Sequence, residues 1–136
     1  GWSHSVFDVR EDYANEDIYP YASELHPISV NEFLQREDSD SLTRFSDILL
    51  LGHDWSVDQD MLLGLLEKSD GSNRPRIGAI GSKAKWKSFR EAAISQGISE
   101  SVVDSVRCPI GLEIGAESPE EIAVAVCAEI MALEKA

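Results

Sequence analysis

The chain has 136 residues, 43% of them apolar, and a formal net charge of −13. This length and composition support one domain with a hydrophobic core and exclude a disordered chain. The negative charge argues against nucleic acid and anionic membranes as partners. Solubility is the simplest explanation of this charge, with salt adaptation or a basic partner surface as alternatives. Two cysteines, Cys108 and Cys127, provide neither a disulfide framework nor a zinc site and favour a cytoplasmic setting, and no apolar run could span a membrane.

The first predicted strand covers residues 5–7, and Asp8 ends it. In nucleotide-binding βαβ units, an acidic residue at the end of the second strand binds the ribose hydroxyls. The glycine-rich turn expected roughly 20 residues before such a residue is not in the sequence. A turn or a helix cap is therefore the alternative role for Asp8.

Residues 11–46 carry weaker signals. We predict a polar loop over residues 11–26 with one helical turn at most, and a short strand over residues 28–30. Asn31 could cap a brief helix ending at Gln35. The acidic stretch 37–41 is typical of a solvated surface loop.

The clearest strand covers residues 47–51 and ends at Gly52. Its four consecutive large aliphatic residues predict a strand buried on both faces, as in a parallel sheet. His53 and Asp54 then lie exposed at the carboxyl end of the strand, where open α/β sheets bind ligands. His53 could carry a proton, contact a ligand or simply occupy a surface loop. An amphipathic helix over residues 58–68 and a loop over residues 70–73 follow.

The most informative stretch is a predicted strand over residues 76–80 that turns through Gly81 and Ser82 into a helix ending before Gly97. Free N–H groups and the helix dipole at such a turn form a site for an anion. Six of the twelve lysines and arginines fall between residues 74 and 90, namely Arg74, Arg76, Lys83, Lys85, Lys87 and Arg90. They predict an anionic ligand, although an exposed helix face is the alternative for the lysines.

The last third contains a short helix from Ser99 towards Arg107, and then two glycines among aliphatic residues in the segment 108–115. Such glycines indicate a backbone that passes close to another strand or to a ligand. A final helix is predicted to begin after Ser118, which caps it, with Pro119 at the first helical position and Glu121 completing a capping box. Its apolar stripe predicts packing on the sheet, and Cys127 is expected in the core.

Four motifs in this order resemble the XdhC/CoxI family, the accessory proteins of xanthine dehydrogenase and related molybdenum hydroxylases. They are Asp8-Val9-Arg10, Gly52-His53-Asp54, the run from Ile80 to Lys85, and the run from Pro109 to Ala123. The resemblance implies one Rossmann-like domain over residues 1–136, with three α/β layers and a mostly parallel sheet.

The resemblance also implies a function. Members are cofactor chaperones without turnover, which bind the molybdenum cofactor, support its sulfuration with a sulfurase and deliver it to the apo-hydroxylase. The implied binding residues are Asp8, Arg10, His53, Asp54, Gly81, Ser82, Lys83 and Lys85, with no catalytic or metal residue. The alternatives are an oxidoreductase domain that binds NAD(P) or another nucleotide, although no Gly-x-Gly-x-x-Gly is present, and an interaction module that has lost its ligand.

Two features depart from the family pattern. Gly52 stands where the family has threonine, and the first strand with its glycine-rich turn is not in the sequence. In the family that strand lies between the strand ending at Asp8 and the strand ending at Gly52. We therefore expect a homodimer or a separate piece to cover the sheet, in preference to a monomer with a closed-up sheet.

Overall fold

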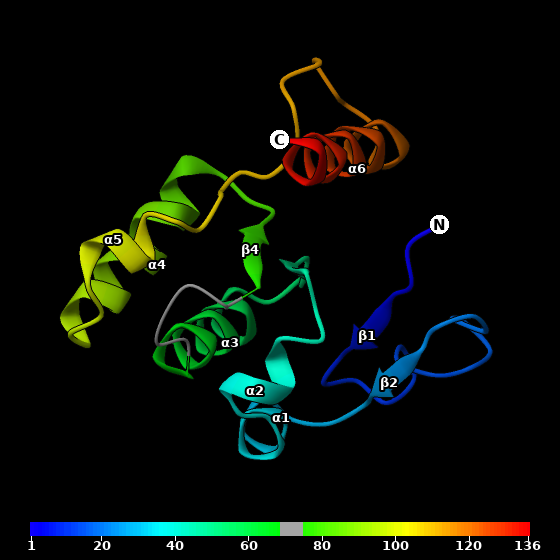
Figure 1. Ribbon diagram of the computed structural model, residues 1–136, viewed down its shortest axis with the longest axis horizontal. Helices are drawn as coiled ribbons and strands as arrows, with labels where there is room; N and C mark the ends of the chain where they lie inside the picture. The colour runs from blue at the N-terminus through cyan, green and yellow to red at the C-terminus, as the bar shows by residue number, and fades with distance from the viewer. Residues whose placement is uncertain (69–74) are drawn as a thin grey trace.

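Two pairs of parallel strands form the framework of the computed structural model, which describes residues 1–68 and 75–136 (Figure 1). Strand β1 (Ser5–Phe7) pairs with β2 (Glu24–His26), and β3 (Asp47–Leu50) pairs with β4 (Arg76–Ala79). The three main predicted strands and their parallel direction are confirmed. The single predicted sheet is not seen within the described ranges, where β1 and β3 belong to separate sheets. The strand expected between them stays a prediction, and the expected loop at 70–73 and Arg74 lie outside the described residues.

The segment 24–42 differs most from the sequence prediction. Residues 24–26, predicted as loop, form β2, and the strand predicted at 28–30 is wrong. Ser29, not Asn31, caps helix α1 (Val30–Arg36), because its Oγ accepts a 3.1 Å hydrogen bond from the amide of Glu32. The acidic stretch is not a solvated loop either: a capping box at Asp38 starts helix α2 (Ser39–Leu42). Pairing with β1 overrode weak local propensity at β2, whereas the starts of α1 and α2 depend on these local caps.

One face of the β3–β4 sheet packs against the main core. Helix α3 (Trp55–Lys68), helix α4 (Lys83–Ser95) and the short helix α5 (Glu100–Val103) contribute to this core, together with α1 and α2. The predicted helix after Ser99 is confirmed but ends earlier than expected. The side chains that meet here include Ile48, Leu50, Leu62, Leu65, Ile77, Ala79, Phe89 and Val103.

The opposite face of the same sheet is covered by helix α6 (Pro119–Lys135). Leu49 and Ile80, which alternate with the residues facing the main core, pack there with Val126 and Ile130. Helices therefore lie on both faces of this sheet, as predicted. The strand predicted as buried throughout ends earlier, at Leu50, and Leu51 is 58% exposed because the chain has already left the ladder.

The segment after α5 runs beside β4 before it reaches α6. Arg107 forms a parallel bridge with Gly78, and the amide of Ile110 donates to the carbonyl of Ala79 at 3.1 Å. Gly111 has a φ of +102°, and a Cβ there would lie 3.2 Å from the Cβ of Ala125 in α6. The close approach predicted for this segment is thus made to a strand and to a helix.

The final helix confirms the capping prediction and corrects one detail. Ser118 and Glu121 form a full capping box, with Pro119 in the first turn. Cys127, however, is exposed rather than in the core, because it lies to one side of the buried stripe formed by Val126 and Ile130.

Candidate functional site

Strands β3 and β4 end at the same edge, where the chain makes two exposed turns. The amide of Ile80 donates to the carbonyl of Leu50 at 3.0 Å and closes the ladder. His53 and Asp54 follow, both exposed as predicted. The Asp54 carboxylate accepts hydrogen bonds from the amide and the hydroxyl of Ser56, at 2.9 and 2.7 Å, which start α3. The hydroxyl of Ser56 lowers the pKa of Asp54, so this carboxylate is charged and used as a helix cap.

The turn after β4 forms the amino terminus of α4. Ser82 caps this helix, since its Oγ accepts a 3.2 Å hydrogen bond from the amide of Lys85. The first turn of α4 carries no acidic side chain, and Ser82, Lys83 and Ala84 are exposed in it. The amides that open a helix have no partner within the helix. This end of α4 therefore presents backbone donors, the positive end of a dipole and the cation of Lys83 to one region of solvent.

Lys85 does not lie on the exposed face of α4. The residue is only 3% exposed, and its Nζ donates to Asp58 Oδ2 at 3.0 Å and to the carbonyl of Ile80 at 2.9 Å. Its charge is thus used inside the protein, beneath the turn, whereas Lys83 and Lys87 are exposed. Lys85 belongs to the site as a support for the turn rather than as a surface cation.

The two glycines at this edge lie directly over the Asp58–Lys85 ion pair. A Cβ at Gly52 would be 2.4 Å from Asp58 Oδ1, and a Cβ at Gly81 would be 2.4 Å from Lys85 Cδ. Gly81 also has a φ of +150°, which disfavours other residues. A side chain at position 52 would therefore displace the Asp58 carboxylate from its place beneath the turn.

Asp58 is the member of this site that sequence reasoning missed. It is 5% exposed and lies on the same side of α3 as Met61, Leu62 and Leu65. A carboxylate within an apolar helical stripe is costly unless it is paired. That pattern was present in the sequence and could have indicated a buried cation partner.

Asp8 and Arg10 form a pair of their own after β1. Arg10 donates from Nε and Nη2 to the two carboxylate oxygens of Asp8, at 3.1 and 3.0 Å, and lies 3.7 Å from the ring centre of Tyr13. The Arg10 guanidinium lowers the pKa of Asp8, and His53 adds a smaller lowering effect. Arg10 therefore already occupies both carboxylate oxygens of Asp8.

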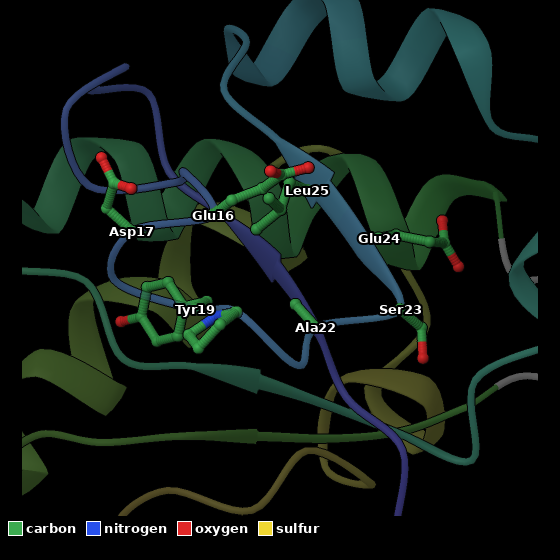
Figure 2. A pocket seen from close by; sticks show the side chains of 8 residues that line it. Glu16, Asp17, Tyr19, Ala22, Ser23, Glu24 and Leu25 are labelled. Atoms are coloured by element: carbon green, nitrogen blue, oxygen red, sulfur yellow. The ribbon is translucent and has the colours of Figure 1, made fainter.

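A separate hollow of about 570 Å³ lies along the loop before β2. Figure 2 shows the carboxylates of Glu16, Asp17 and Glu24 around it, with Tyr19. The negative charges of Glu16 and Asp17 repel an anion, and Glu24 already pairs with Arg44 at 2.8 Å, so this hollow does not suit the ligand expected at α4. Among the residues that the structure describes, no group of three or more His, Cys, Asp or Glu could hold a metal, and no helix is long and apolar enough to cross a membrane.

Three comparisons show what the chain is similar to. The family model for the XdhC Rossmann domain matches residues 1–130. The chain is 30% identical over 136 residues to a probable xanthine dehydrogenase subunit of Bacillus subtilis, and 26% identical over 132 residues to the uncharacterized protein YqeB of Escherichia coli. These matches cover 99% and 96% of this chain, but 37% and 23% of the two relatives. The crystal structure of a xanthine dehydrogenase from Bacillus halodurans superposes with a TM-score of 0.77 at 28% identity, covering 99% of this chain and 38% of that one.

Proposed function

The chain belongs to the XdhC family through its Rossmann domain, and on that premise we propose that it binds the molybdenum cofactor, or a nucleotide, during maturation of a xanthine-dehydrogenase-type molybdenum hydroxylase. Its partners in this role are the apo-hydroxylase and a cofactor sulfurase, in the cytoplasm. The relatives named above as xanthine dehydrogenases support the choice of enzyme class. The role is that of a chaperone without turnover.

The observation that carries this proposal is the exposed amino terminus of α4 at the carboxyl edge of the β3–β4 sheet. Its first turn has no acidic side chain, and it displays Ser82 and Lys83 beside the exposed turn at His53. The molybdenum cofactor is a pterin that ends in a phosphate or a dinucleotide, so it presents an anion. Backbone N–H groups, a helix dipole and a lysine are the donors that such an anion requires. The residues present therefore fit the anionic end of the group.

Each side chain has a distinct task in the proposed complex. Lys83 and the opening amides of α4 bind the anion, and His53 contacts the ligand from the neighbouring turn. Asp54 holds the start of α3, and Lys85 holds the carbonyl of Ile80 and so the position of the turn. When bound, the cofactor would supply the redox chemistry of the hydroxylase, and this domain supplies binding and orientation only.

A nucleotide-binding oxidoreductase is the alternative function. Asp8 at the end of β1 is the residue that would bind ribose hydroxyls in that case. Both of its carboxylate oxygens already accept hydrogen bonds from Arg10, which leaves fewer acceptors for a ribose. We therefore favour the chaperone.

Calorimetric titration tests this proposal. The chain is titrated with NADP⁺, with a simple nucleotide and, without oxygen, with molybdenum cofactor released from a hydroxylase. We expect Lys83→Glu to weaken cofactor binding at least about tenfold through loss of a charge-assisted contact. Lys87→Glu, the same charge change on an exposed part of the same helix, should change it less than about twofold. Equal effects would remove Lys83 from the site, and NADP⁺ binding with hydride transfer would favour the oxidoreductase.

A further inference from the structure

Helix α6 has a second apolar face, on the side opposite the sheet. At 100° per residue, positions 120, 124, 127, 128, 131 and 135 share that side. Val124 is 61% exposed and Met131 48% exposed, and Cys127 between them is also exposed. We call Glu120, Val124, Cys127, Ala128, Met131 and Lys135 the outer face of α6.

A helix that covers a sheet normally carries polar residues on its other side. Here the middle of the outer face is apolar over two turns, and its charges, Glu120 and Lys135, lie at its ends. Glu121 and Glu134 border the face at the same two ends, and Glu134 accepts a 3.1 Å hydrogen bond from Trp2. Figure 1 shows α6 at the periphery of the molecule. An apolar stripe with charged ends on a peripheral helix is typical of a contact surface.

From these observations we infer that the outer face of α6 docks against the same face of a second copy of this chain, in an antiparallel helix pair. With the twofold axis between positions 127 and 128, Glu120 lies opposite Lys135 of the other copy, and Val124 lies opposite its Met131. Within the outer face, opposite charges thus meet at the ends and apolar side chains meet in the middle. Antiparallel packing also places the helix dipoles in opposite directions.

Self-complementarity is what selects a second copy over another occupant. A symmetric dimer needs one patch that matches itself after a twofold rotation, and the outer face of α6 meets that condition in both charge and apolarity. A different protein or a flanking segment would require no such match within a single helix. One helix pair of this length is small for a specific interface, so we expect dissociation constants of about 10–100 µM.

Sedimentation of the 136-residue chain from about 5 to 500 µM, in about 150 mM salt to screen the net charge, tests the inference. The chain should pass from monomer to dimer across this range. Met131→Glu places a carboxylate opposite Val124 and should weaken the dimer at least about 100-fold. Met131 is exposed, so circular dichroism should show an unchanged fold.

A charge swap distinguishes this register from any other interface. Glu120→Lys and Lys135→Glu should each weaken the dimer about tenfold, and the double variant should restore it to within about threefold. The first change raises the formal net charge from −13 to −11. If nonspecific repulsion alone governed association, this smaller negative charge would make the Glu120→Lys variant associate more strongly. Pairing with Lys135 requires the opposite effect.

Cys127 reports the register directly. Diamide, which takes two electrons and two protons from a pair of thiols, should join two copies through Cys127 at dimer-forming concentrations. The Cys127→Ser variant should not be joined, and the Cys108→Ser variant should be. The inference is overturned by a monomer at every concentration, by a dimer that Met131→Glu leaves intact, or by a double swap that restores nothing.

Discussion

The two ends of the β3–β4 sheet use charge in different ways. At the amino end, Arg76 donates to both oxygens of Asp47, at 2.9 and 2.8 Å, and Arg107 pairs with Glu129 of α6. The second oxygen of Glu129 reaches along β4 towards its other end and accepts a 2.9 Å hydrogen bond from the amide of Gly111. Each of these charged side chains joins elements that are distant in the chain, so this end serves stability.

At the carboxyl end only one ion pair is buried among the described residues, and the remaining polar groups face solvent. Asp58 and Lys85 pair beneath Gly52 and Gly81, whereas His53 and Lys83 stay exposed above them. The buried pair holds the turns in place, and the exposed groups remain available to a ligand. This contrast indicates that stability and binding are separated between the two ends, and four substitutions test that separation.

The largest effect is expected from breaking the buried ion pair. Lys85→Met leaves the Asp58 carboxylate buried without a cation and should lower the free energy of unfolding by about 3–5 kcal/mol, as measured by urea denaturation. Lys83→Met, an equivalent change at an exposed lysine, should cost less than about 0.5 kcal/mol. The double variant Asp58→Ala/Lys85→Met should recover much of the loss; if it is less stable than Lys85→Met, the pair is not what the single change disrupts.

Asp47→Asn tests the amino end, and its effect should depend on pH. Hydrogen bonds from Arg76 lower the pKa of Asp47 below its ordinary value of 3.8. The charged carboxylate therefore stabilises the fold above about pH 4, and this contribution is lost as the pH falls through the lowered pKa. At pH 7 the variant should lose about 2 kcal/mol.

Urea unfolding of wild type and Asp47→Asn at several pH values checks this prediction. The difference between them should shrink as the pH falls below 3.8, the ordinary value for Asp47. Asp54→Asn, the same substitution at the exposed carboxyl end of the sheet, is the matched control variant. A constant difference down to pH 2 would show that Asp47 contributes through its shape rather than its charge.

Gly52→Ala should have a smaller effect at the carboxyl end. The added Cβ would lie 2.4 Å from Asp58 Oδ1, so the buried carboxylate must shift away from Lys85. We expect a loss of about 1–2 kcal/mol. In the Asp58→Ala/Lys85→Met background the same change should cost almost nothing, and an unchanged cost there would assign the effect to the backbone of the turn instead.

His53→Ala should have the smallest effect on stability. His53 is exposed, so the free energy of unfolding should change by less than about 0.5 kcal/mol. Binding of the cofactor or nucleotide should nevertheless weaken, because His53 lies beside the start of α4 in the proposed site. Unaltered affinity would restrict the binding site to the turn at Gly81 and to Lys83.

Local patterns in the sequence were sufficient for much of the fold. Several features depend only on residues that are close together in the sequence. They are the strands at 47–50 and 76–79, the turn through Gly81 and Ser82, and the capping box at Ser118. Such features are determined by neighbouring residues, through hydrophobic periodicity and capping hydrogen bonds. The exposed groups of the candidate site, His53 and Lys83, could be named for the same reason.

Only the tertiary structure decided how distant residues combine. Three features depend on what packs against the element concerned. They are the pairing of β1 with β2, the ion pair between Asp58 and Lys85 across 27 positions, and the exposure of Cys127. A lysine in a helix has the same local pattern whether it faces solvent or a buried carboxylate. Its surroundings, set by the way α3 and α4 pack on the sheet, determined that Lys83 is available to a ligand and that Lys85 is not.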